Sequence, residues 1–257
     1  MSGAEQIAWG QALGIGPADV PALVVLEGSW WQRERTALRL ACLDDVRELT
    51  FPEFHLGRRR TDRLPVAYSC VYGAARAVEP IHVYAQLGAP TIVQIGSCGS
   101  LQTHVRTGDV VLAETAAIGE GASQYYGGHV TSRATPELVD RAEAAFTSLG
   151  FTVHRGLHVT TSALFAQPPE RVAAWSDAGY LAVDMETSAV FSAAHHFGLP
   201  AVSLLFVWDE LLAGRSFLHP YTGVEQAAQA RANAALMDVA LSLVPSTTPE
   251  SASGPPR

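Results

Sequence analysis

The sequence predicts an α/β fold, a single domain of three α/β/α layers whose central sheet is mixed and mostly parallel. Two observations lead to this prediction. Short runs rich in Val, Ile and Leu alternate along the chain with longer segments of helical periodicity. The chain also has 257 residues, 48% of them hydrophobic, which is enough for one domain with a substantial core.

Strands and helices are expected in alternation. The apolar runs predict buried strands over residues 22–26, 66–71, 91–95, 110–113, 181–183 and 202–207. Helical periodicity predicts helices over 76–87, 136–149, 187–197 and 225–243. Gly88 and Gly150 are suited to end the first two helices, and Pro136 suits the first turn of the second. We expect the domain to span residues 10–243 and the tail 244–257, which lacks apolar periodicity, to be disordered.

Charge and cysteine content exclude several classes of protein. A net charge of −8 argues against a nucleic-acid-binding surface, and the basic run 58–60 is interpreted as a solvated hairpin. Three cysteines without zinc-site spacing, and no visible export signal, favour a cytoplasmic protein. The apolar runs are too short to cross a bilayer. His195 and His196 lack an i, i+4 partner, so we expect no metal site, and no motif indicates a cofactor.

A Gly-rich segment comes after the predicted strand 91–95. It runs from Gly96 to Ser100 and includes Ser97, Cys98 and Gly99. A strand that ends in small residues leaves backbone N–H groups free and lets a ligand approach the main chain closely. The competing interpretation is a tight turn without a ligand, because such turns are common after strands.

Carboxylates come directly after two other predicted strands. Asp184 and Glu186 come after the run 181–183, and Asp209 comes after the run 202–207. In open α/β sheets the carboxyl ends of the strands form the edge where ligands bind. The alternative is that Asp184 and Glu186 only favour the start of the next helix and that Asp209 only caps the segment after its strand.

Taken together, these segments resemble the nucleoside phosphorylase superfamily, which includes uridine phosphorylase, hexameric purine nucleoside phosphorylase and methylthioadenosine nucleosidase. Residues 13–15 resemble the family's opening segment, 96–99 its Gly-rich loop, 107–111 the GDVV strand after that loop, and 184–189 its ribose-binding segment. The resemblance covers about residues 12–243. The ordered set of motifs, with its spacing, is specific, whereas one motif alone would not be.

The resemblance implies cleavage of a nucleoside N-glycosidic bond through an oxocarbenium-like transition state. Glu186 would accept hydrogen bonds from the 2′ and 3′ hydroxyls of the ribose. Met185 would lie beneath the sugar, although plain core packing remains open for it. Asp209 would protonate or hydrogen-bond a purine base, which requires a raised pKa.

The base loop gives a mixed indication. Residues 161–165 and the pair Glu170-Arg171 resemble the loop that holds uracil in uridine phosphorylase, but Pro169 stands where that loop has a Gln. Asp209, which uridine phosphorylase lacks, favours a purine or purine-like base. The candidate substrate-binding residues are therefore Ser97, Cys98, Gly99, Phe165, Arg171, Asp184, Met185 and Gln94.

The sequence departs from the family at the phosphate site, where the phosphorylases use three arginines. The N-terminal turn reads EGSWW over 27–31, Pro52 precedes the Glu53-Phe54 pair, and Gln94 precedes the Gly-rich loop. Water could replace phosphate, with Glu27 as a catalytic general base. Alternatively, new arginines could rebuild an anion site, with Arg76 and Arg59 as candidates.

We therefore expect cleavage of a nucleoside by water or through an atypical phosphate site. The alternatives are a standard-type uridine or purine nucleoside phosphorylase with a rebuilt phosphate site, and a catalytically inactive relative that binds a nucleoside. The expected partners are a nucleoside and, if an anion site is present, phosphate, with no nucleic acid and no membrane. The resemblance also implies a homodimer or hexamer.

Overall fold

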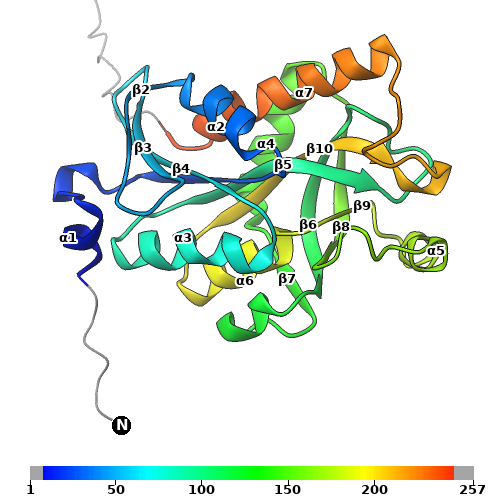
Figure 1. Ribbon diagram of the computed structural model, residues 1–257, viewed down its shortest axis with the longest axis horizontal. Coiled ribbons are helices and arrows are strands. Elements are labelled where there is room, and N and C mark those ends of the chain that lie inside the picture. The colour runs from blue at the N-terminus through cyan, green and yellow to red at the C-terminus, as the bar shows by residue number, and fades with distance from the viewer. Residues whose placement is uncertain (1–7, 246–257) are drawn as a thin grey trace, which may run out of the picture.

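The computed structural model describes residues 8–245, within which ten strands form one mixed sheet with helices on both faces (Figure 1). The predicted α/β fold is confirmed. Of the predicted disordered tail, residues 246–257 lie outside the described part of the chain.

Four parallel strands form the middle of the sheet. Their order is β4 (Pro65–Val71), β1 (Leu23–Gly28), β5 (Ile92–Ser100) and β10 (Ala201–Glu210). All four contain predicted apolar runs, and they are buried on both faces, as parallel strands between two helical layers should be. Because they run in the same direction, their carboxyl ends meet at one edge of the sheet.

Five strands close into a ring on one side of this sheet. β10 also pairs antiparallel with β6 (Val110–Gly119), and β6 pairs parallel with β8 (Val153–Thr161). β8 pairs with the short β9 (Ala182–Asp184), which returns antiparallel to β5. The ring was not predicted because β8 was not: its first five residues are half-buried or exposed and show no continuous apolar run.

The outer strands were also not predicted. β3 (Phe54–Arg59) pairs antiparallel with β4, β2 (Leu43–Glu48) forms the edge beyond it, and β7 (Thr131–Arg133) pairs with β6. β2 reads LDDVRE, and only Leu43 of it is buried. Charged edge strands of this kind resist pairing with other molecules, and they carry little of the hydrophobic signal that sequence patterns detect.

The Gly-rich segment 96–100 is strand rather than loop, which corrects the expectation from the sequence. β5 continues through it to Ser100, and its residues pair with β10 and with β9. Glycine is needed at Gly96 because a Cβ there would lie 3.1 Å from the carbonyl oxygen of Gly28 on β1. The small residues therefore allow close packing between strands at the edge where the strands end.

Helices cover the two faces of the sheet as separate groups. On one face lie α3 (Ala74–Gln86) and α6 (Thr187–His196), which pack against each other (Figure 1). On the other lie α2 (Gln32–Leu40), α4 (Pro136–Ser148) and α7 (Gly223–Ser242) (Figure 1). Helices α3, α4, α6 and α7 confirm the predicted helices to within two residues at each end. The short α1 (Trp9–Leu13) and α5 (Pro169–Asp177), like α2, were not predicted.

The alternation of side chains along each strand divides the core into two main clusters. Val24 and Leu26 of β1 pack in the cluster under α3 and α6. Leu23 and Val25 pack in the other cluster, under α4 and α7. This period of two is a consequence of strand geometry, and it decides which side chains of β1 can reach which helical layer.

Arg59 is not an anion site, and the run 58–60 is a hairpin that is only partly solvated. The Arg59 guanidinium is buried and binds both carboxylate oxygens of Asp62, at 2.8 and 2.6 Å. It also donates to the carbonyl oxygens of Leu241 and Val244, at 2.6 and 2.7 Å, and so ties the end of α7 to the hairpin between β3 and β4. The N–H groups of the Arg59 guanidinium therefore bind Asp62 and the end of α7 and stabilise the fold.

Arg59→Ala should destabilise the fold by about 3 kcal/mol, because it removes one partner of a buried ion pair together with the bonds that fix α7. Urea unfolding would measure the loss. Arg60→Ala is the matched control, since its side chain is 60% exposed and should contribute less than about 1 kcal/mol. Equal effects of the two substitutions would contradict the structural role of Arg59.

Candidate functional site

A cavity of about 610 Å³ lies at the carboxyl ends of the parallel strands. It is reached by the end of β1 at Gly28, by Ser97–Gly99 of β5, by the segment after β9, and by Trp208 and Asp209 of β10. Ser97, Cys98, Gly99, Phe165, Asp184, Met185, Glu186 and Asp209 all line it, so the structure brings together most of the predicted site residues.

Glu186 is held rigidly at the bottom of the cavity. It is buried at the N-cap of α6, and the backbone N–H of Gly73 donates to its Oε1 at 2.7 Å. Gly28 leaves room for the carboxylate, because a Cβ at that position would lie 2.3 Å from Oε2. Burial, reinforced by the charge of Asp184, raises the pKa of Glu186 to about 8.

Asp184 belongs to a buried polar network under the same loop. Its oxygens accept hydrogen bonds from Thr160 Oγ1 at 2.9 Å and from the Thr187 backbone N–H at 3.0 Å, and Nε2 of His158 lies 3.0 Å away. Burial acts to raise the pKa of Asp184, but His158 and the donated hydrogen bonds outweigh it and lower that pKa. Asp184 therefore fixes the start of α6, and with it the position of Glu186.

Gln94 serves this network rather than the cavity. It is fully buried, and its Nε2 donates to Asp184 at 2.8 Å. It is not among the residues that line the cavity, so the expectation that it binds substrate directly is replaced by a supporting contact.

Asp209 projects into the cavity from the end of β10. A β-bulge interrupts the pairing of β10 with β5 between Val207 and Asp209, and bulges of this kind redirect the next side chain along the strand. A Cβ at Gly99 would lie 2.8 Å from Leu211 and 3.0 Å from the Asp209 carboxylate, so glycine leaves room for both side chains. Burial raises the pKa of Asp209 to about 7, partly opposed by the backbone N–H groups of Asp209 and Phe217.

Glu27 is wrongly predicted as the general base. Its side chain is on the opposite face of β1 from the cavity, buried beneath α2. Arg39 donates to both of its oxygens, at 2.9 and 2.8 Å, and the Tyr68 hydroxyl donates at 2.8 Å. With its oxygens held in this way, Glu27 cannot take a proton from a water in the cavity.

The predicted arginines also lie outside the cavity. Arg171 is exposed and donates to the carbonyl oxygen of Ala166 at 3.1 Å. Arg76 forms an ion pair with Glu79 at 2.6 Å on the surface of α3. Neither is among the residues that line the cavity, so neither is placed to bind a base or an anion there.

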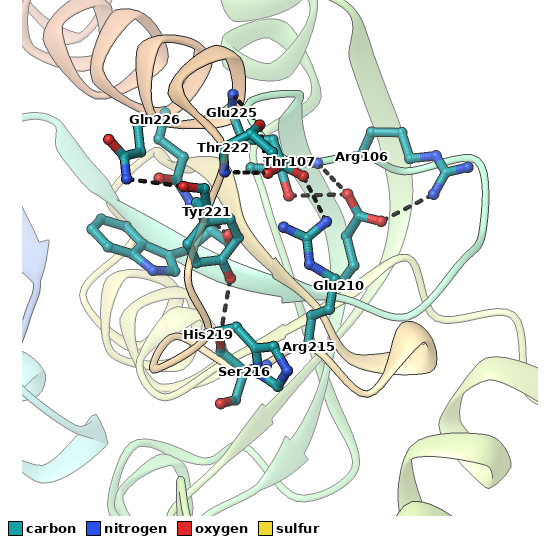
Figure 2. A network of polar contacts seen from close by, with 12 residues as sticks. Arg106, Thr107, Glu210, Arg215, Ser216, His219, Tyr221, Thr222, Glu225 and Gln226 are labelled. Atoms are coloured by element: carbon teal, nitrogen blue, oxygen red, sulfur yellow. Dashed lines mark hydrogen bonds and ion pairs between the residues drawn. The ribbon is translucent and has the colours of Figure 1, made fainter.

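One arginine does line the described part of the cavity, and it is already paired. Arg215 binds Glu225 at 2.6 Å and lies over the ring of Tyr221, 4.8 Å from the centroid (Figure 2). Figure 2 also shows how this segment is fastened at its start, where Glu210 accepts hydrogen bonds from Thr107 at 3.0 and 3.1 Å. The segment after β10 is therefore held across the cavity at both of its ends.

Sequence reasoning missed most of the aromatic wall of the cavity. Besides Phe165, and Trp208 next to Asp209, the wall includes Trp30, Trp31, Tyr72 and Phe217. The signal was present in the Trp30-Trp31 pair, which comes directly after a strand end. It was interpreted only as the loss of a phosphate-binding turn.

Two further features can be excluded for the described residues. Among residues 8–245 no three His, Cys, Asp or Glu side chains gather in a group that could hold a metal ion. In the same part of the chain, no helix has the length and apolar character needed to cross a bilayer.

Comparison with known proteins agrees with the resemblance found in the sequence. The family model described as the phosphorylase superfamily matches residues 43–242. A DeoD-type purine nucleoside phosphorylase of Caldanaerobacter subterraneus is 26% identical over 216 residues, covering 79% of this chain and 89% of that enzyme. One from Bacillus cereus is 29% identical over 151 residues, covering 56% and 64%. The crystal structure of uridine phosphorylase from Vibrio fischeri has the same fold, with a TM-score of 0.76 at 20% identity, covering 88% of this chain and 93% of that one.

Gly28→Ala should destabilise the protein by about 1–3 kcal/mol, because the new methyl group collides with the Glu186 carboxylate. Thermal or urea unfolding would measure the change. In a Glu186→Ala background the same substitution should cost much less, since the colliding group is gone. Gly16→Ala is the control: its φ of −80° suits alanine, and nothing lies within 4 Å of the new atom. An equal cost in both backgrounds would show that Glu186 does not lie over Gly28.

Proposed function

Because the chain belongs to the phosphorylase superfamily, we propose that it cleaves the N-glycosidic bond of a nucleoside, preferably one with a purine or purine-like base. The observation that carries the proposal is the presence of two buried carboxyl groups, Glu186 and Asp209, in one cavity at the carboxyl ends of neighbouring strands. Each has a pKa raised into the neutral range, which is typical of groups that bind and protonate substrate.

Glu186 would hold the ribose. An ionised carboxylate can accept hydrogen bonds from two neighbouring hydroxyl groups, and it places negative charge near the cation that develops at C1′. The Gly73 N–H already binds one side of the carboxylate, so its orientation is set before substrate enters. This rigidity supports Glu186 as the group that fixes the sugar.

Asp209 would protonate the leaving base. With a pKa of about 7, it carries a proton for much of the time near neutral pH, and it can give that proton up as the bond breaks. A purine offers a ring nitrogen able to receive a proton at the side of the base. The position of Asp209 in the same cavity as Glu186 supports this role.

Water is the nucleophile that the cavity favours. A phosphate dianion needs several charge-assisted donors. Among the described residues that line the cavity, Arg215 is the one cation, and Glu225 already neutralises it. We therefore propose hydrolysis as the main reaction.

Phosphorolysis remains a second candidate because of Arg35. Its guanidinium lies under Trp208, 5.6 Å from the ring centroid, and only 3.9 Å from Glu27, whose oxygens are held by other donors. Within the described residues Arg35 donates no hydrogen bond from its side chain. A movement of Trp208 would open it to the cavity and supply a charge for phosphate.

Hydrolysis predicts that a purine nucleoside is cleaved at the same rate with and without phosphate. The measurement is release of free base across a panel of nucleosides, with ribose and ribose 1-phosphate assayed as products. Ribose as the sugar product in phosphate buffer would support water as the nucleophile. Base release only when phosphate is added would overturn hydrolysis and favour the Arg35 alternative, which Arg35→Gln would then abolish.

The pH dependence of kcat/KM should be bell-shaped with its maximum between about 7 and 8. Glu186 must lose its proton to accept two hydroxyls, so activity is lost at low pH. Asp209 must keep its proton, so activity is lost at high pH. Because the pKa of Glu186, about 8, lies above that of Asp209, about 7, the active arrangement of protons is a minor form, and the rising and falling limbs bend near pH 7 and pH 8. Asp209→Asn should lower the maximum by about 10²-fold and remove the falling limb. A falling limb that persists in this variant would assign the acid to another group.

A further inference from the structure

The cavity has two ends of different character. Glu186 and the glycine backbone around it form a polar end that suits the ribose. At the other end Asp209 lies close to Leu211, since both approach Gly99, and the apolar side chains of Leu212 and of Val172 on α5 also line the cavity. On the proposed function, this second end receives the base.

A continuous belt of aromatic rings, here called the aromatic belt, runs from one end of the cavity to the other. Neighbouring ring centroids lie between 5.0 and 6.4 Å apart. In spatial order its members are Tyr72, Trp30, Phe165, Phe217, Trp31 and Trp208. Aromatic rings at such separations attract a further ring in offset or edge-to-face contact.

The middle of the belt is exposed. Phe165, which contacts both Trp30 and Phe217, is 74% exposed, and Trp30 is 50% exposed. Large apolar side chains that line a cavity and remain open to solvent mark a surface that a ligand can cover. A base without substituents would contact Asp209 and the rings next to it, which leaves this part of the belt open.

Charge restricts which ligands can cover the belt. Asp184, Glu186 and Asp209 supply acidic groups to the cavity, and the Arg215 guanidinium is paired with Glu225. An anionic group on the substrate, such as a phosphate or a carboxylate, would therefore find no unpaired cation among the described residues that line the cavity. The cavity volume of about 610 Å³ lies within the range that buries most of a drug-sized ligand.

We propose that the preferred substrate is a nucleoside whose base carries a planar, apolar and uncharged substituent, which lies on the aromatic belt at Phe165 and Phe217. The substituent would extend from the base end because Phe217 adjoins Asp209 in the segment after β10, and because the apolar side chains of Leu164, Val172 and Ala173 line the cavity together with Phe165. This inference rests on the proposed function for the assignment of the two ends, and it adds the chemical class of the substrate.

The test compares two nucleosides that differ only in such a group, adenosine and 6-benzylaminopurine riboside. We expect kcat/KM to be at least about tenfold higher for the benzyl compound, which is the effect of burying one phenyl ring. Phe165→Ala should reduce this ratio to less than about threefold. Because the Phe165 side chain is largely exposed, the variant should fold normally. Leu149→Ala, which removes an apolar side chain that is half exposed at the end of α4, should keep the wild-type ratio.

A third nucleoside locates the substituent. Adenosine that carries a phenylthio group at the 5′ carbon presents the same ring from the sugar instead of the base. A preference for this compound alone would overturn the inference, as would equal kcat/KM values for adenosine and the benzyl compound. A ratio that Phe165→Ala leaves unchanged would also overturn it.

Binding separates this inference from the proposed function. Calorimetric titration of the Asp209→Asn variant with the same two nucleosides measures affinity while turnover is slowed by about 10²-fold. Tighter binding of the benzyl compound, with no cleavage by the wild-type protein, would sustain the substrate class and remove the catalytic proposal. Cleavage of both compounds by the wild-type protein, with equal affinities for the two, would sustain the catalytic proposal and overturn the substrate class.

Discussion

The burial of carboxyl groups at the ends of neighbouring strands is the constraint on which the rest of the site depends. A buried charge without partners is strongly unfavourable, so such groups either become neutral or receive hydrogen bonds. Both solutions occur here. Asp184 is surrounded by donors and stays ionised, whereas Glu186 and Asp209 have few donors and have raised pKa values. This difference in surroundings separates a structural acid from acids that can exchange protons.

The glycines of the site are required by the same constraint. Gly28 leaves room for the Glu186 carboxylate, and Gly99 leaves room for the Asp209 carboxylate and for Leu211. Both belong to strands, and neither is needed for a turn. Their lack of a side chain therefore provides the space that the two carboxyl groups occupy.

The sequence predicted much of the fold and the centre of the site, but not the direction of individual side chains. The buried parallel strands and four helices were found because continuous apolar runs and helical periodicity depend on local pattern. Glu186 and Asp209 were singled out because each comes just after such a run, and both line one cavity, whereas their catalytic roles stay predictions. Glu27 was assigned wrongly because one residue of shift along β1 moves a side chain to the other face of the sheet, and the pattern around it cannot show which face is the cavity. Arg59 was assigned wrongly because its hydrogen bonds reach the end of α7, a segment far away in the sequence.

The proposed catalytic groups and the exposed rings of the aromatic belt belong to different kinds of structure, the former to the ring formed by β5, β10, β6, β8 and β9 and the latter to loops. Asp209 and the start of the Glu186 segment belong to strands that are paired on both sides, so neither can move without breaking hydrogen-bonded ladders. Phe165 and Phe217 stand on loops outside the ring. Loop residues such as Phe165 and Phe217 can therefore change, and alter which ligand fits the cavity, without disturbing the paired strands that carry the proposed catalytic groups.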